Sequence, residues 1–381
     1  MRRLVALVGA VVLVDTMFYA AITPLLPKLT DELALGKAGA GVLAGAYAAG
    51  TLLGSLPGGW LAARAGVKPT VLLGVGLMSV AGLTFAFAHS APLLDGARFL
   101  QGIGGACSWA GGMAWLAGAV PRERRGEVLG GALGAAIFGV QLGPVIGALA
   151  TAVGRGPAFA TAVLFGAALG AWAWATPGPR RGAAEALATP AAALRDRSIV
   201  AGMWLTLLPA VAFGLLDLLA PLRLADLGAS GLAIGVAFFA AAGVEAIVSP
   251  LTGRFTDRRG AAALVRAGLA GGAAVIVVLQ LPGTAVGLGL AVVAAAGVLG
   301  VLWVPAMGLL TGGADHIGLD HGFAFAFFNL AWALGFTIGS GGGGVLAAAT
   351  RDPVPYLAVA GLYAASALAG SRRPRPLACP R

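Results

Sequence analysis

The sequence predicts an all-α membrane protein in which twelve transmembrane helices form two pseudo-symmetric six-helix bundles. Three observations predict this fold class. Of the 381 residues, 59% are hydrophobic and only 10% are charged, whereas soluble domains carry roughly 25% charged residues. The apolar residues form long continuous runs, each long enough to cross a bilayer. The two halves of the chain also share a repeated pattern, described below.

The apolar runs are separated by charges, prolines and glycines. A helix needs about 20 apolar residues to cross roughly 30 Å of hydrocarbon, and the strands of a membrane barrel would instead alternate every second residue. In chain order, the predicted spans are 4–24, 39–60, 69–88, 92–118, 127–151, 157–175, 199–220, 231–252, 262–281, 285–311, 322–349 and 355–371.

The distribution of basic residues predicts the orientation. With both termini in the cytoplasm, the inner segments hold nineteen Lys and Arg residues and the outer loops hold five. Basic residues concentrate on the cytoplasmic side of membrane proteins. The net charge of +10 is therefore explained by basic residues along the inner membrane surface, and this distribution argues against nucleic acid as a partner. We expect a multi-pass protein of the cell (inner or plasma) membrane.

The polar connection 177–197 divides the chain. We expect an N-terminal six-helix bundle over 1–176, a cytoplasmic linker over 177–197, and a C-terminal six-helix bundle with a basic cytoplasmic tail over 198–381. Residues 27–66 align without a gap on residues 221–260 at an offset of 194, so that spans 1–2 match spans 7–8. Parallel six-span halves with a site between them are a transporter architecture.

Two loops in this repeat have a recognisable pattern. The first, GWLAARAGVK at 59–68, contains Gly59, Arg64 and Gly66; the second, GRFTDRRGA at 253–261, contains Gly253, Asp257, Arg258 and Gly260. Their glycines permit tight turns. Asp257 and Arg258 could latch onto a neighbouring helix end; the alternative is a solvated turn. At the offset of 194, Ala63 stands opposite Asp257, so the first loop lacks this acidic latch and the two loops are expected to act asymmetrically.

Two further motifs lie in predicted spans four and five. The fourth contains LDGARFLQGIGGA at 94–106, and the fifth contains GVQLGPVIGAL at 139–149. Gly139, Gly143 and Gly147 recur every four residues, which leaves one helix face bare for a close neighbour, and Pro144 bends the helix. Ordinary small-residue packing would give the same pattern.

With these four stretches in order, the sequence resembles the major facilitator superfamily over nearly its full length. The fifth-span motif is similar to that of the antiporter branch, especially the drug:proton antiporters. The resemblance implies two six-helix bundles, a mid-membrane cavity and transport by alternating access. It also makes the loops at 59–68 and 253–261 gating loops, and it puts spans one and four on the same cavity.

Four ionisable residues within the predicted spans stand out: Asp15, Arg98, Asp217 and Glu245. Such residues face the bundle interior or a wet cavity and usually mark function. Arg98 needs an anion, and both Asp95, three residues earlier, and Asp15 are candidates. Arg98 either forms a structural pair with Asp95, or acts on a cavity carboxylate or the substrate. Burial favours the protonated form of a carboxyl group, whereas a nearby cation favours the ionised form. A carboxyl group held between these two effects is suited to bind and release a transported proton.

Polar and aromatic residues on the same helix faces are candidates for the cavity wall. An aromatic cavity with few polar groups suits amphipathic or cationic organic molecules, although each aromatic could equally serve helix packing. Besides the ionisable residues, the predicted wall comprises Phe18, Tyr19, Gln101, Trp109, Phe138, Gln141, Asn329 and Trp332.

The sequence gives little support to other chemistry. DHIGLDH at 315–321 places two Asp–His pairs in a loop without a third cluster nearby, so we expect no metal site. No P-loop, H-E-x-x-H or G-x-S-x-G motif is found, so we expect neither an enzyme nor a cofactor.

The favoured function is proton-coupled efflux of small organic or drug-like compounds by a monomer, with protons, substrate and the lipid bilayer as its partners. The alternatives are a metabolite importer or uniporter of the same fold, and a non-transporting membrane protein such as a lipid scramblase or sensor.

Reporter fusions test the orientation. Because basic residues lie mainly in the segments assigned to the inner side, reporters fused near positions 185 and 378 should both report the cytoplasm. A periplasmic signal at either position would contradict the twelve-span topology.

Overall fold

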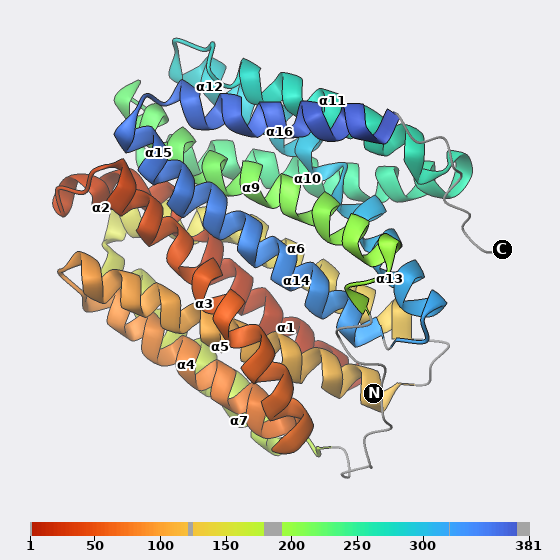
Figure 1. Cartoon of the computed structure of the whole chain (residues 1–381). Helices are drawn as coiled ribbons and strands as arrows, with labels where there is room; N and C mark the ends of the chain where they lie inside the picture. The colour runs from red at the N-terminus through yellow and green to blue at the C-terminus, as the bar shows by residue number, and fades with distance from the viewer. Residues whose placement is uncertain (1, 121–124, 179–192, 320, 372–381) are drawn as a thin grey trace.

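The structure, a computed structural model, describes residues 2–120, 125–178, 193–319 and 321–371, and the secondary-structure elements within these residues are all helices (Figure 1). Its elements are α1 (Arg2–Ala20), η1 (Thr23–Leu25), α2 (Leu26–Glu32), α3 (Lys37–Arg64), α4 (Val67–Phe87), α5 (Ala91–Ala119), α6 (Arg125–Val153), α7 (Arg155–Ala175), α9 (Arg197–Asp226), α10 (Gly231–Arg259), α11 (Ala261–Val278), α12 (Ala285–Gly300), α13 (Trp303–His316), α14 (His321–Thr337), η3 (Ile338–Gly342), α15 (Gly343–Ala349) and α16 (Pro353–Ser371).

The helices agree with an all-α membrane protein. Within the described residues, ten helical runs are long and apolar enough to cross a bilayer. The predicted fourth span falls on α5, which contains Asp95 and Arg98 and is not among the ten, and the predicted twelfth falls on α16, whose apolar part is shorter. The count of twelve spans therefore stays a prediction.

Several predicted spans are interrupted helices. The first comprises α1, η1 and α2, because Pro24 has no N–H with which to continue the α1 hydrogen-bond ladder. The tenth is divided into α12 and α13, and the eleventh contains η3, a π-helical turn between α14 and α15. Such turns inside helices are frequent at functional sites.

The helices pack in two sets that follow the order of the chain. In the first set, α5 packs on α3 and α4, α7 on α4, and α6 on α1; in the second, α9 packs on α13 and α14, α10 on α12, and α16 on α11. Contacts between the sets join α6 to α10 and α3 to α14 and α15. The division into two bundles by the linker 177–197 stays a prediction, because residues 179–192 lie outside the described part.

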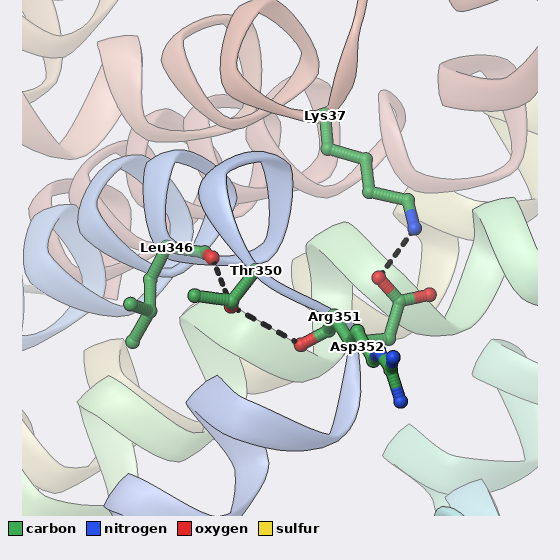
Figure 2. A network of polar contacts seen from close by, with 5 residues as sticks. All are labelled: Lys37, Leu346, Thr350, Arg351 and Asp352. Atoms are coloured by element: carbon green, nitrogen blue, oxygen red, sulfur yellow. Dashed lines mark hydrogen bonds and ion pairs between the residues drawn. The ribbon is translucent and has the colours of Figure 1, made fainter.

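The two sets approach most closely near the ends where α2 and α15 lie, and diverge toward the end where the N-terminus lies (Figure 1). At the close end, a Cβ on Gly41 of α3 would lie 2.5 Å from the Ser340 carbonyl oxygen and 3.1 Å from Gly344. Figure 2 shows Lys37, at the start of α3, paired with Asp352 just before α16. Beside it, Thr350 donates to the Leu346 carbonyl at 2.5 Å. By the predicted orientation, this closed end is the outer one.

The repeat at offset 194 is visible in the backbone. Ala34 and Gly228 occupy equivalent positions and both have positive φ, 49° and 86°. The N–H of Leu35 bonds the Thr30 carbonyl, and at the same offset Ala229 bonds Leu224. Ala34 holds this left-handed conformation at some cost, since only glycine adopts it freely.

Glycines set the distance between α3 and α5. A Cβ on Gly102 would lie 2.0 Å from the Tyr47 carbonyl oxygen, and a Cβ on Gly50 would lie 2.0 Å from that of Phe99. Close backbone approach of this kind is how membrane helices gain van der Waals contact where lipid offers no hydrophobic driving force.

We predict that Gly102→Ala destabilises the protein by about 1–3 kcal/mol, because α3 and α5 must separate to admit the methyl group. Gly96→Ala is the matched control on the same helix, since no atom lies within 4 Å of its added Cβ. Thermal unfolding of the purified protein measures both. Equal melting temperatures for the two variants would contradict the packing described.

Candidate functional site

Asp15 lies at the centre of the first set of helices and is 0% exposed. Its Oδ2 accepts hydrogen bonds from the Tyr47 hydroxyl at 2.8 Å and from Trp109 Nε1 at 3.2 Å. Its Oδ1 is buried without a hydrogen-bond partner among the described residues. Gly105 leaves room for the carboxylate, because a Cβ there would lie 2.9 Å from Oδ2. α1, α3 and α5 thus build one acidic site.

Arg98 is 1% exposed and donates mainly to backbone carbonyls. Its Nη1 donates to the Phe18 carbonyl at 3.3 Å and to Gln101 Oε1 at 2.9 Å, and Nη2 donates to the Tyr19 carbonyl at 3.0 Å. Its guanidinium carbon lies 5.7 Å from the ring centre of Tyr19 and 5.3 Å from that of Tyr47. These contacts join α5 to the end of α1.

Neither of the two candidate anions forms an ion pair with Arg98. Among the described residues, no carboxylate oxygen of Asp95 or Asp15 lies within 4 Å of the guanidinium nitrogens. Asp15 is close enough for charge attraction without contact. The reason is local. α1 stops at Ala20, so its last carbonyls lack helical partners, and Arg98 both bonds them and complements the negative end of the helix dipole.

Tyr19 centres an aromatic cluster that joins the two sets of helices. Its ring lies 4.6 Å from Tyr47, 5.6 Å from Trp332 and 5.7 Å from Phe336, centre to centre. Trp332 and Phe336 are on α14, so α1 and α3 meet α14 here. The structure therefore brings together Tyr19 and Trp332, two residues of the predicted cavity wall.

A second acidic site lies in the C-terminal half. Glu245 Oε1 accepts a hydrogen bond from Trp303 Nε1 at 2.7 Å, and Asp217 is near enough to Glu245 for their charges to interact. Trp303 stacks on Phe213 at 6.0 Å and 16° and lies 5.8 Å from Phe328. Two carboxyl groups thus adjoin an aromatic surface, a combination suited to organic cations.

Other predicted wall residues are placed differently. Gln141 is half-buried and donates to the Ala242 carbonyl at 3.2 Å, which links α6 to α10. Phe138 is 52% exposed and makes none of the described ring contacts, so the structure does not bring it to the cavity aromatics. Asn329 is half-buried on α14. Phe18 is buried, and its ring lies 5.8 Å from Phe159.

The structure adds Tyr47 and Trp303, which sequence reasoning did not select. Each donates to a buried or half-buried carboxylate. The available signal was that Tyr and Trp in a membrane interior need a partner for their O–H or N–H. Predicted intramembrane carboxylates are the natural acceptors for these groups.

The fifth-span motif packs against α1. A Cβ on Gly139 would lie 2.2 Å from the Leu13 carbonyl oxygen, one on Gly143 would lie 2.4 Å from the Ala20 Cβ, and one on Gly147 would lie 2.1 Å from the Ala21 carbonyl oxygen. Pro144 is buried inside α6. Thr16 of α1 also donates to the Ala136 carbonyl at 2.8 Å. The bare face therefore seats α1, the helix that holds Asp15.

The two loops of the repeat turn at equivalent glycines. Gly66 and Gly260 have φ of 103° and 79° and each precedes a helix. Gly59 and Gly253 lie within the preceding helices, and Arg64, which stacks 5.1 Å from the Trp60 ring, and Arg258 are exposed. The side chains of Ala63 and Asp257 lie outside the described part, so the predicted acidic latch stays untested.

The family model described as Major Facilitator Superfamily matches residues 8–319. Multidrug resistance protein MdtL of Shewanella sp. (strain ANA-3) is 33% identical over 124 residues, 32% of this chain and 31% of the relative. The synaptic vesicular amine transporter of Homo sapiens is 41% identical over 92 residues, 24% of this chain and 18% of the relative.

These sequence matches cover well under two thirds of the relatives. A crystal structure of D-xylose-proton symporter aligns with a TM-score of 0.76 at 17% identity, over 97% of this chain and 96% of that one. At this identity, the likeness concerns the fold alone.

The contacts of Arg98 predict graded effects of substitution. Arg98→Ala leaves two α1 carbonyls and Gln101 without their donor, which costs about 1–3 kcal/mol for each buried group. Arg98→Lys keeps the charge but offers a single nitrogen. We expect Arg98→Ala to lower both thermal stability and transport more than Arg98→Lys does.

Melting temperature and proteoliposome flux measure these effects, with the exposed Arg351→Ala as the control. Flux through Arg98→Ala equal to that of the parent would show that Arg98 is dispensable for transport.

Proposed function

Because the chain belongs to the major facilitator superfamily, it is a multi-pass membrane transporter rather than an enzyme, and we propose that it exports small organic compounds in exchange for protons. The resemblance recognised from the four motifs is confirmed at the level of the family. Its direction of transport, its coupling ion and its substrates are the proposal.

The environment of Asp15 is the observation on which the proton coupling rests. The carboxyl is fully buried, one oxygen takes two neutral donors, and the other has no described partner. Burial favours the neutral acid, while hydrogen-bond donors and the nearby Arg98 favour the carboxylate. A carboxyl between opposing effects can change protonation when its access alternates from one side of the membrane to the other.

Glu245 and Asp217 give the C-terminal half a corresponding acidic site. Glu245 has the neutral donor Trp303, and Asp217 is its near neighbour. In this architecture the two halves rock against each other, so that the cavity opens first to one side of the membrane and then to the other. An acidic site in each half would then meet both sides in turn, as proton exchange requires. We propose Asp15 as the principal proton carrier and Glu245 as a site for protons or cationic substrates.

The substrates proposed are amphipathic or cationic organic molecules. The aromatic rings around Tyr19 and Trp303 offer apolar faces beside carboxylates. The partial sequence matches to a multidrug resistance protein and to an amine transporter support this class. The importer or uniporter alternative predicts net flux in the opposite direction, or flux without a proton gradient, and the same assay distinguishes it.

We further propose that the protein acts as a monomer in the cell membrane with both termini in the cytoplasm. The loops at 59–66 and 253–260 then lie at the inner surface as gating loops. In the described conformation the predicted outer end is closed by contacts of α3 with η3 and α15. The divergence of the two sets toward the other end (Figure 1) supports an inward-facing state.

We predict that Asp15→Asn abolishes proton-driven transport but retains substrate exchange, because an amide keeps the shape of the site and cannot carry a proton. Glu245→Gln should alter proton dependence or weaken recognition of cationic substrates. Substrate flux in proteoliposomes, with and without an imposed proton gradient and with a small panel of organic cations and neutral compounds, measures both effects.

Asp226→Asn, which removes an exposed carboxylate, is the matched control and should behave like the parent. If the double variant Asp15→Asn, Glu245→Gln responds to the gradient like the parent, neither residue carries the proton. Asp217 would then be the next residue to test.

A further inference from the structure

Tyr47 of α3 contacts both the buried acid of α1 and the aromatic cluster that joins the two sets of helices. It is buried, and its hydroxyl donates to Asp15 Oδ2 at 2.8 Å. Its ring centre lies 4.6 Å from that of Tyr19, and the Tyr19 ring in turn contacts Trp332 and Phe336 of α14. A chain of contacts therefore runs from the carboxyl group, through Tyr47 and Tyr19, to the second set of helices.

The neighbours of Tyr47 on α5 leave its side chain little freedom. A Cβ on Gly105 would lie 2.6 Å from the Tyr47 hydroxyl oxygen, and one on Gly102 would lie 2.0 Å from the Tyr47 carbonyl oxygen. The guanidinium carbon of Arg98 lies 5.3 Å from the centre of the ring. Because backbone and ring are both closely packed, the strength of the bond to Asp15 bears directly on where the ring lies.

Few other charges act on Asp15. Arg98 of α5 is close enough for charge attraction, and α4, α6 and α7, which also pack on α1, bring no described charged group near it. Asp217 of α9 and Glu245 of α10 interact by charge with Tyr19, at the other end of the chain of contacts. Protonation of Asp15 is therefore the change of charge closest to the Tyr47 hydroxyl.

A proton on Asp15 changes the strength of this bond. Oδ2 accepts from both Tyr47 and Trp109, whereas Oδ1 has no hydrogen-bond partner among the described residues and is the oxygen left for a proton. A hydrogen bond to an ionised acceptor is roughly twice as strong as one between neutral groups. The ionised carboxylate therefore holds Tyr47 firmly, and Tyr47 supports the Tyr19 ring against α14. Protonation weakens the first contact of this chain.

We propose that Tyr47 is the positioning residue that couples the charge of Asp15 to the contact between the two sets of helices. This role rests on the proposed assignment of the transported proton to Asp15. The carrier without proton or substrate is held with its predicted outer end closed, and a proton on Asp15 loosens that contact. A substrate that inserts between the rings of Tyr19 and Trp332 loosens it from the other end. Exchange requires such control, because a carrier that reoriented unloaded would let either ligand cross alone.

The distance between the two sets at the predicted outer end measures this coupling. Spin labels are attached to Ser90→Cys and Arg351→Cys, two exposed positions in different sets, after Cys107 and Cys379 are replaced by alanine. Pulsed electron resonance in nanodiscs then gives the closed and open populations in acidic and alkaline buffer. Acidification should change their ratio about fivefold, the difference between a charge-assisted and a neutral hydrogen bond.

Three variants break the chain at different places. Tyr47→Phe keeps the ring and loses the hydroxyl, and Tyr19→Leu keeps the bond to Asp15 and loses the ring contacts with α14. Both should reduce the response to pH to less than about twofold, because neither can pass on the weakened bond. Trp109→Phe is the matched control, since it removes the other donor to Oδ2 but not the chain, and it should keep the fivefold response.

A response like that of the parent in either Tyr47→Phe or Tyr19→Leu would overturn the proposal, as would an equal loss in Trp109→Phe. Asp15→Asn separates this result from the exporter proposal, because an amide cannot titrate. If Asp15→Asn responds to pH like the parent, the proton is not carried at Asp15, and the role of Tyr47 is overturned with that assignment. If Asp15→Asn loses the response and Tyr47→Phe keeps it, the coupling role alone is overturned.

Discussion

The end of α1 inside its predicted membrane span is the constraint around which the N-terminal helices are arranged. Hydrocarbon offers no water to bond the last carbonyls of a helix, and Pro24 cannot continue the ladder. The planar fork of Arg98 reaches the Phe18 and Tyr19 carbonyls through two different nitrogens, whereas a lysine would have to reach both carbonyls from a single nitrogen. The charge of Arg98 is thereby tied to the backbone of the helix that holds Asp15.

In this arrangement Arg98 both holds the end of α1 and influences the charge of Asp15. Since Arg98 is bonded to neutral carbonyls and Gln101, its charge is not neutralised by a contacting carboxylate, and it acts on Asp15 at longer range. A direct ion pair would fix Asp15 as an anion. The glycines of α6, which admit α1 closely, and Gly105, which leaves room for the carboxylate, complete the same site.

Much of the fold could be predicted from the sequence, since long apolar runs, the 194-residue offset and four motifs together indicate the family, now confirmed. Charges within apolar runs also singled out Asp15 and Arg98, which are buried. Shared helix faces selected Tyr19 and Trp332, whose ring centres lie 5.6 Å apart. The sequence could not identify the hydrogen-bond partners of these residues. The acceptors of Arg98 are backbone carbonyls, which leave no trace in residue types.

Other contacts escaped the sequence for the same physical reason. Asp95, three residues before Arg98, is the obvious partner by spacing, but spacing says nothing about a competing acceptor on another helix. Phe138 is 52% exposed, and its place in the cavity wall stays a prediction. Tyr47 and Trp303 were missed because the faces of α3 and α13 that meet the carboxylates are set by tertiary packing.

The pair between Lys37 and Asp352 makes the closed end sensitive to its surroundings. Their side chains are 40% and 36% exposed, and ion pairs this accessible contribute at most about 1 kcal/mol. The screening length falls from about 8 Å at physiological ionic strength to about 3 Å at 1 M salt. The salinity of the medium facing this end therefore shifts the balance between the conformation that has this ion pair and conformations that lack it, by up to about fivefold.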